Sequence, residues 1–119
     1  AVLADSVYTI EIIEPLARTA AERLERLGYD NVVVRHGDGY RGWPEKAPFD
    51  CIIVTAAPDH VPEPLVEQLA IGGRLVIPVG DAYQELLAIE KTPEGLARQR
   101  IIPVRFVPMT GEAQDAKDR

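Results

Sequence analysis

The sequence predicts an α/β fold whose sheet is mostly parallel and ends in an antiparallel hairpin. Short β-branched apolar runs alternate with segments whose apolar residues recur at helical spacing. The connections between the early runs are long enough to cross over between parallel strands. The last two runs are joined through Thr92-Pro93-Glu94-Gly95, which predicts an antiparallel hairpin. Together these features favour a sheet with an antiparallel edge.

The first half of the chain predicts a strand, a helix and a second strand. Residues 7–13 form the first β-branched run, and Pro15 suits the first turn of the helix that follows. The helix has an apolar face and is expected to end at Gly28. Its apolar face consists of Leu16, Ala17, Ala20, Ala21, Leu24 and Leu27. Residues 32–34 then predict a second buried strand, parallel to the first because such crossovers are right-handed.

The second half continues the alternation and then changes it. A loop with a turn of helix is expected over residues 37–48, followed by a fully buried parallel strand over residues 49–56. A short helix with the apolar stripe Leu65, Val66 and Leu69 should stop at Gly72-Gly73. The remaining predicted elements are a strand at 74–80, an antiparallel pair at 85–91 and 99–107, and a polar, frayed tail at 111–119.

Composition limits the classes of function. The chain has 119 residues, 46% of them hydrophobic, which suits one compact domain at most. A net charge of −6 argues against a nucleic-acid partner, which requires clustered cations. One cysteine excludes an intrachain disulfide and favours a reducing compartment. With no membrane-spanning run and no basic-then-apolar leader, the expectation is a soluble, cytoplasmic protein with no membrane partner.

Two carboxylates at predicted strand ends suggest a nucleoside site. In open α/β sheets the ligand crevice lies beyond the carboxyl ends of the strands. Glu11, near the end of the first strand, can accept hydrogen bonds from two adjacent sugar hydroxyls. Asp38 follows the second strand between Gly37 and Gly39, and its carboxylate can accept from the exocyclic amine of adenine. The alternatives are a solvated acid at Glu11 and a simple turn at Asp38.

Other chemically distinctive residues are weaker candidates. Thr55-Ala56-Ala57-Pro58 has small side chains that allow a ligand near the backbone, although a tightly packed loop is an equal alternative. His60 has no partner acid or nucleophile at a recognisable spacing, so a surface role is favoured over general-base catalysis, and His36 is interpreted as structural. Cys51, inside an apolar run, is predicted to be an inert core residue. No His or Cys cluster has metal-ligand spacing.

Several motifs, taken in order, give the chain a resemblance to the protein-L-isoaspartate O-methyltransferase family. They are Val7-Tyr8-Thr9-Ile10-Glu11, Gly37-Asp38-Gly39-Tyr40, the run from Phe49 to Pro58, Gly72-Gly73-Arg74-Leu75-Val76-Ile77-Pro78-Val79-Gly80, and Val104-Arg105-Phe106-Val107-Pro108-Met109-Thr110-Gly111. The resemblance covers nearly the whole chain. The Thr-Ala-Ala-Pro loop and the Phe-Val-Pro-Met-Thr segment distinguish this family from other methyltransferases with the same Rossmann-like sheet.

The resemblance implies a repair enzyme that methylates the free carboxylate of L-isoaspartyl residues in damaged proteins, with S-adenosylmethionine as cofactor and S-adenosylhomocysteine as product. It implies cofactor-binding roles for Glu11 at the ribose hydroxyls, for Asp38 and Gly39 at the adenine end, and also for Ile12 and Thr110. It implies that the substrate channel is lined by Thr55, Ala56, Ala57, Pro58, Val107, Pro108 and Met109. No catalytic base is implied, because alignment and exclusion of water should supply most of the rate.

The chain departs from the family pattern at its amino-terminal side. The family's glycine-rich turn, and the central strand before it, would lie between the strands at 7–13 and 49–56 but precede this sequence. Residues 1–110 are therefore interpreted as a partial methyltransferase domain whose exposed strand edges favour association or misfolding. The chain alone is expected neither to bind the cofactor tightly nor to methylate. The alternatives are another methyltransferase of this fold, acting on a small molecule or nucleic acid, and a non-catalytic, partner-binding fragment.

Overall fold

The computed structural model describes residues 2–114 and divides the chain into two compact units. Unit 1 is Ala1–Gly39 and unit 2 is Tyr40–Arg119. The strands belong to two separate sheets, one with the order β1-β2 and one with the order β3-β4-β5-β6. The α/β class with parallel pairs and an antiparallel hairpin is confirmed.

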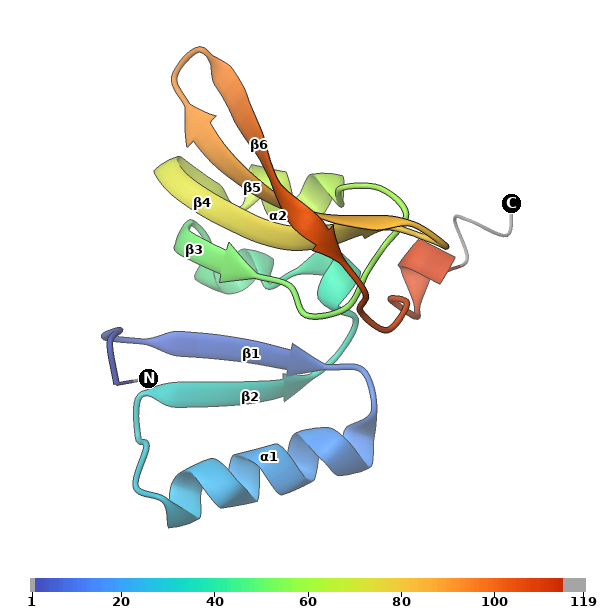
Figure 1. Ribbon diagram of the computed structural model, residues 1–119. Coiled ribbons are helices and arrows are strands. Elements are labelled where there is room, and N and C mark those ends of the chain that lie inside the picture. The colour runs from blue at the N-terminus through green and yellow to red at the C-terminus, as the bar shows by residue number, and fades with distance from the viewer. Residues whose placement is uncertain (1, 115–119) are drawn as a thin grey trace. The chain divides into compact units, whose positions relative to one another are not determined.

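Unit 1 is a single strand–helix–strand motif (Figure 1). β1 (Val7–Glu11) and β2 (Val32–His36) run parallel, and α1 (Glu14–Arg26) connects them. A proline lies in the first turn of α1, where its missing N–H costs no hydrogen bond. Gly28 ends the helix with a φ of +83°, a conformation that glycine adopts without a steric penalty. The predicted motif is therefore confirmed, although β1 stops at Glu11 rather than at residue 13.

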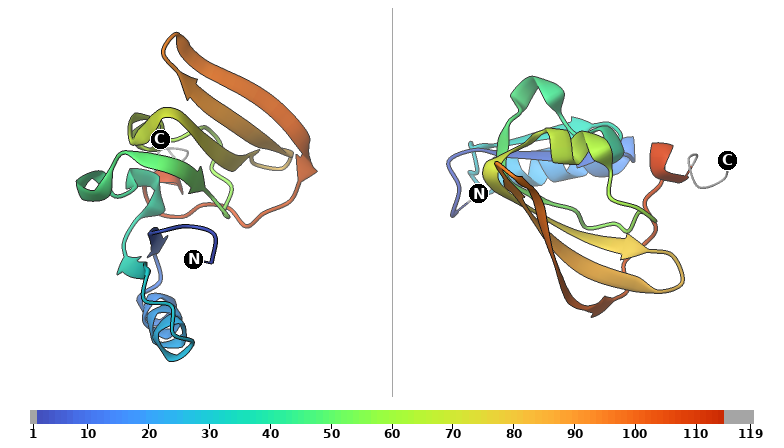
Figure 2. Two further views of the ribbon diagram at one scale, coloured as in Figure 1. Left: turned by 90° about the vertical axis from the view of Figure 1, so that its left-hand side faces the viewer. Right: turned by 90° about the horizontal axis from the view of Figure 1, so that it is seen from above.

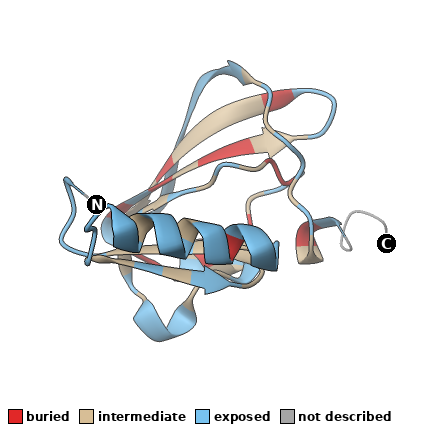
Figure 3. Cartoon of the chain, turned by 90° about the horizontal axis from the view of Figure 1, so that it is seen from below, coloured by how far each residue is buried: buried red, intermediate tan, exposed pale blue. Residues whose placement is uncertain are grey.

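The apolar face predicted for α1 is only partly covered. Ala17 is buried, but Leu16 is 53% exposed and Leu27 is 70% exposed. Most of α1 is exposed in Figure 3. The sheet of this unit has only two described strands, which offer α1 a small apolar surface to pack against. The predicted apolar face is therefore present in α1, but much of it is exposed in this unit.

Unit 2 is built on a four-stranded mixed sheet (Figures 1 and 2). Its strands are β3 (Phe49–Ile53), β4 (Leu69–Gly80), β5 (Gln84–Thr92) and β6 (Gly95–Val104). The 3₁₀ turns η1 (Gly39–Arg41) and η2 (Pro44–Lys46) precede β3, and α2 (Glu63–Glu67) connects β3 to β4. β3 is parallel to β4, whereas β5 and β6 form the expected antiparallel hairpin.

Several predicted boundaries in unit 2 were wrong. The helix expected to reach Gly72 ends at Glu67, and Leu69 instead begins β4. The pairing of Leu69 with Phe49 explains this, because it starts the ladder early and a register irregularity absorbs the following residues. β3 ends at Ile53 rather than at residue 56. β6 covers Gly95–Val104 rather than residues 99–107, so residues 105–107 have left the sheet.

The core of unit 2 lies on one face of the sheet. Five buried side chains form it: Leu65, Leu69, Leu75, Ile77 and Ile89. Ile52 and Val54 of the β3 segment pack against this cluster, but Cys51 is exposed and Ile53 is 70% exposed. Successive side chains of a strand point to opposite faces, and β3 pairs only with β4 among the described strands. The predictions of a fully buried strand and of a core position for Cys51 were therefore wrong.

The segment after β6 includes a short helical turn. A frayed tail was expected from residue 111, but the Gln114 N–H donates to the Gly111 carbonyl over 3.1 Å in a helical turn. Ala113 is only 3% exposed, and Glu112 Oε2 lies 2.7 Å from Arg41 Nε. Packing of this turn thus overrides its polar composition. The rest of the predicted tail, residues 115–119, lies outside the described residues.

Candidate functional site

The carboxyl ends of β1 and β2 bring two predicted cofactor residues to the same edge of unit 1. Glu11 is in register with His36, and the Gly37 N–H donates to the Glu11 carbonyl over 3.0 Å. Asp38 follows immediately, and both acidic residues are half-buried. Parallel pairing alone produces this arrangement, since strands in register end together. The edge is where ligands of open α/β sheets bind.

One oxygen of the Glu11 carboxylate accepts a hydrogen bond and the other does not. Its Oε1 accepts the Ile13 N–H over 3.2 Å, and in the described residues its Oε2 has no hydrogen bond or ion pair. The Ile12 carbonyl accepts from Nε2 of His36, in the tautomer protonated there, over 3.0 Å. This contact supports the structural role predicted for His36. The free carboxylate oxygen suits vicinal hydroxyl groups, which donate as a pair.

In unit 2 the structure joins the two predicted substrate segments. The Ala57 N–H donates to the Val107 carbonyl over 2.7 Å, and the Met109 N–H donates to the Ala57 carbonyl over 2.9 Å. Ala57 thereby forms a parallel bridge with Pro108. The pairing could not be read from the sequence, because the two segments are separated by three strands and a helix.

The residues around this bridge differ in exposure. Ala57 and Pro58 are buried, and the Pro58 carbonyl accepts the Gly80 N–H over 2.9 Å. Thr55 is exposed, Ala56 is half-buried and Val107 is 69% exposed. Pro108 and Thr110 are exposed, whereas Met109 is half-buried. The bridge therefore has a hydrogen-bonded backbone and an exposed rim.

The sequence reasoning missed the partners of His60. Its Nδ1 lies 2.5 Å from Asp59 Oδ1, and its Nε2 lies 2.7 Å from the Tyr40 hydroxyl. The Tyr40 and His60 rings also meet edge to face, with centroids 5.5 Å apart. The statement that His60 lacks a partner acid was therefore wrong. The adjacent Asp59 was the available signal, but only the fold shows that the loop after β3 returns to Tyr40.

The sequence reasoning also missed two buried glutamines. Gln68 is 8% exposed, accepts the Trp43 N–H over 2.8 Å, and donates to the Arg41 carbonyl over 2.8 Å. Gln84 is 6% exposed and makes the same kind of paired contact with Phe106. Gln68 directly precedes β4 and Gln84 begins β5, so each glutamine adjoins an apolar run that was visible in the sequence. Nothing in the sequence, however, indicated which backbone each amide would bind.

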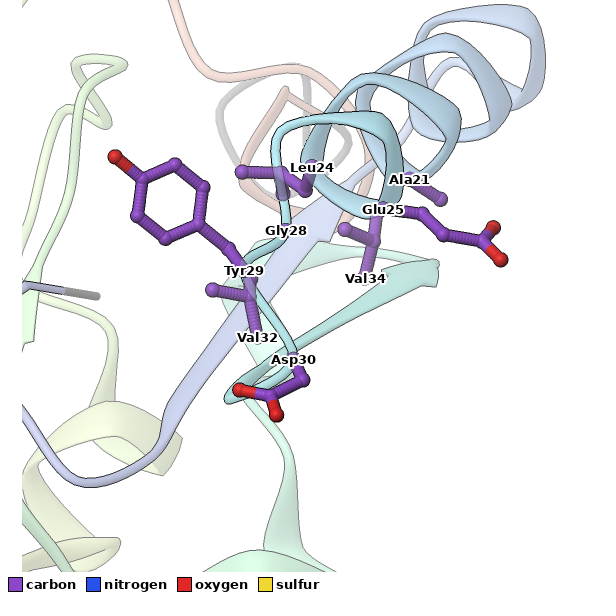
Figure 4. Close-up of a pocket in the computed structure, with 8 residues that line it drawn as sticks. All are labelled: Ala21, Leu24, Glu25, Gly28, Tyr29, Asp30, Val32 and Val34. Carbon is purple, nitrogen blue, oxygen red and sulfur yellow. The ribbon is translucent and has the colours of Figure 1, made fainter.

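A hollow of about 340 Å³ in unit 1 is not at this site. It is lined by Ala21, Leu24, Glu25, Gly28, Tyr29, Asp30, Val32 and Val34, from the end of α1, the following turn and β2 (Figure 4). It therefore adjoins the beginning of β2, whereas Glu11 and Asp38 lie at the strand ends.

In the described residues no group of three or more His, Cys, Asp or Glu side chains could hold a metal ion. No helix there is long and apolar enough to cross a membrane.

Curated relatives share the sequence over most of this chain. A protein-L-isoaspartate O-methyltransferase 2 of Syntrophobacter fumaroxidans is 63% identical over 109 residues, which are 89% of this chain and 44% of the relative. A protein of the same name from Polaromonas is 58% identical over 113 residues, which are 92% of this chain and 54% of the relative. The chain thus spans about half the length of the curated relatives it matches.

Solved structures agree with these relatives. A protein-L-isoaspartate O-methyltransferase matches 91% of this chain, and 35% of its own, with a TM-score of 0.85 and 33% identity. A Plasmodium falciparum protein assigned as a β-aspartate methyltransferase, in complex with S-adenosyl-L-homocysteine, matches 88% of this chain and 52% of its own with a TM-score of 0.76 and 31% identity. The model of one protein family matches residues 2–114. The chain therefore belongs to the protein-L-isoaspartate(D-aspartate) O-methyltransferase family.

Proposed function

We propose that residues 2–114 are part of a protein-repair methyltransferase. This enzyme would esterify the free carboxylate of L-isoaspartyl residues in peptides and proteins. Membership of the family supports the reaction type. The observation that carries the proposal for this chain is the bridge between Ala57 and residues 107–109. It joins the two segments that distinguish this family from other methyltransferases with the same sheet.

We propose S-adenosylmethionine as the cofactor, bound at its nucleoside end by unit 1. The Oε2 of Glu11 is available to two ribose hydroxyls, with Ile12 beside it, and the Asp38-Gly39 turn suits the adenine end. Thr110 is proposed to contact the cofactor from the closing segment. When bound, the cofactor supplies an activated methyl group. The complex of a structural relative with S-adenosyl-L-homocysteine supports this choice.

The substrate role is assigned to backbone and small side chains rather than to a base. Thr55, Ala56, Ala57 and Pro58 are proposed to line one side of the channel, and residues 107–109 the other. The isoaspartyl carboxylate is itself the nucleophile, so no proton has to be removed from it at neutral pH. These residues would exclude water and fix the direction of approach, which is the main source of rate in such a transfer.

Methyl transfer should be tested in a chimera. The matched residues of this chain replace the corresponding segment of the Syntrophobacter fumaroxidans relative, and an isoaspartyl peptide is compared with its aspartyl twin. We expect methylation of the isoaspartyl peptide alone. Methylation of both peptides, or of a small molecule instead, would favour a different methyltransferase of this fold.

Glu11→Gln in the same chimera tests the cofactor site. Loss of a charged acceptor costs about 1.5–3 kcal/mol, or roughly ten- to a hundredfold in cofactor affinity. Glu14→Gln is the matched control, because Glu14 is exposed and its ion pair with Arg18 contributes little. Equal cofactor affinity in the two variants would contradict the role of Glu11.

We propose that the 119-residue chain alone neither binds the cofactor tightly nor methylates. Its strands form two separate sheets, and Ala17 is the one buried residue among the described residues of unit 1. Calorimetry should detect no micromolar binding of S-adenosylmethionine, and such binding would refute the proposal. Among the described strands β1 pairs only with β2 and β3 only with β4, and such unpaired strand edges would favour association, which sedimentation would detect. We propose a cytoplasmic location, no nucleic-acid partner and no membrane partner, consistent with the net charge of −6.

A further inference from the structure

Gln84 extends the sheet beyond the end of β6 by means of its side chain. The last backbone pair of the hairpin joins Gln84 to Val104, where β6 ends. Two residues later, the Phe106 N–H donates to Gln84 Oε1 over 2.7 Å, and Gln84 Nε2 donates to the Phe106 carbonyl over 3.1 Å. A primary amide carries the same donor and acceptor as a peptide group. The Gln84 side chain thus occupies the place of a neighbouring strand for Phe106.

This contact is buried, which makes it costly to lose. Gln84 is 6% exposed, and a longer contact of 3.4 Å joins Nε2 to the Asp81 carbonyl. If the side-chain amide were removed, the Phe106 N–H and carbonyl would lose these partners while remaining half-buried. Unsatisfied buried polar groups destabilise a local conformation more than a single hydrogen bond stabilises it.

The contact also closes a ring around the substrate loop. From Phe106 the chain passes to Val107, whose carbonyl accepts the Ala57 N–H. Pro58 then accepts from the Gly80 N–H, and Gly80 is paired with Gln84 across β4 and β5. Residues 105–107 lie outside β6. Within this ring two contacts hold the segment: Gln84 binds Phe106, and Ala57 binds Val107 and Met109.

We propose that Gln84 is a positioning residue: its amide sets the path of residues 107–109 and thereby the register of their bridge with Ala57. The proposal deepens the proposed function and rests on it for its consequence, which is substrate affinity. Gln84 itself touches neither substrate nor cofactor in this scheme. It acts through Phe106, and its loss should loosen one wall of the peptide channel while the sheet remains folded.

The test compares Gln84→Met with Gln68→Met in the chimera described above. Both variants replace a buried amide that pairs with backbone groups by an apolar side chain of similar length. They differ in the segment that is released, which is residues 106–109 for Gln84 and residues 41–43 for Gln68. Amide hydrogen exchange reports each segment separately, and it requires no methyltransferase activity.

In Gln84→Met we expect exchange at the Ala57 and Met109 amides to accelerate about tenfold, with no such change in Gln68→Met. The KM for the isoaspartyl peptide should rise about tenfold, while the KM for S-adenosylmethionine stays within about twofold. Unchanged exchange at both amides in Gln84→Met, or equal acceleration in both variants, would overturn the positioning role. Faster exchange with an unchanged peptide KM would uphold the positioning and refute the substrate role of residues 107–109.

Discussion

Replacing Gly80 by alanine should destabilise unit 2 much more than the same change at Gly95. Both glycines have nearly the same backbone conformation, with φ of +140° at Gly80 and +138° at Gly95. A Cβ at Gly80 would overlap the Tyr83 carbonyl oxygen and lie 2.8 Å from the Gln84 Cα. At Gly95 a Cβ would meet nothing within 4 Å. The pair therefore separates the cost of the backbone angle from the cost of the overlap.

The magnitude follows from these two contributions. An alanine forced to a glycine-only φ costs about 1–3 kcal/mol, and both variants share that cost. Overlap with backbone atoms cannot be relieved by a rotamer change, so Gly80→Ala should lose about 1–3 kcal/mol more, as in an overpacked core. The total expected at Gly80 is about 2–6 kcal/mol, a large part of the stability of a small domain.

Urea unfolding followed by the fluorescence of the single tryptophan, Trp43, measures the difference. Trp43 lies in unit 2, where its backbone N–H donates to Gln68 Oε1. Its emission therefore reports the unfolding of that unit. With a slope of about 1–2 kcal/mol per molar urea, a difference of about 1–3 kcal/mol should separate the two midpoints by about 0.5–3 M. Equal midpoints for Gly80→Ala and Gly95→Ala would refute the argument, because the backbone angle would then account for the whole effect.

Three further predictions concern burial. Leu75→Ala should cost about 2–5 kcal/mol because Leu75 is fully buried, whereas Ile53→Ala, at a position 70% exposed, should cost under about 1 kcal/mol in the same urea assay. Amide exchange in the 119-residue chain should be faster in β1 and β2 than in β4 and β5, since Ala17 is the one buried residue described in unit 1; slower exchange in β1 would contradict this. A thiol reagent should label Cys51 in the folded chain nearly as fast as in urea, and strong protection would show that β3 is covered.

Local patterns were sufficient for the elements of unit 1 and for the hairpin. Pro15 and Gly28 marked the helix ends correctly, because each acts on its own backbone dihedral angle. The turn predicted over residues 92–95 indicated antiparallel pairing for a similarly local reason, and in the structure Pro93 and Glu94 join β5 to β6. Glu11 and Asp38 could be placed at the same edge because parallel strands in register end together.

The same patterns failed where the environment of an element decides its burial. The apolar run containing Cys51 predicted a strand covered on both faces, but β3 has a neighbour on one side only in the described chain. Leu69 was assigned to a helix by its spacing, yet pairing with Phe49 draws it into β4. Apolar sequence shows that a residue benefits from burial, but not whether another element is present to bury it.

The sequence by itself determined the fold class, the order of the elements and the identity of the strand-end acids, since each depends on residues close together in the chain. Only the tertiary structure decided that Ala57 pairs with Val107 and Met109, that Gln84 binds Phe106, and that His60 contacts Tyr40. These contacts join residues far apart in sequence. No local pattern specifies such contacts, because they depend on how distant segments are brought together in the fold.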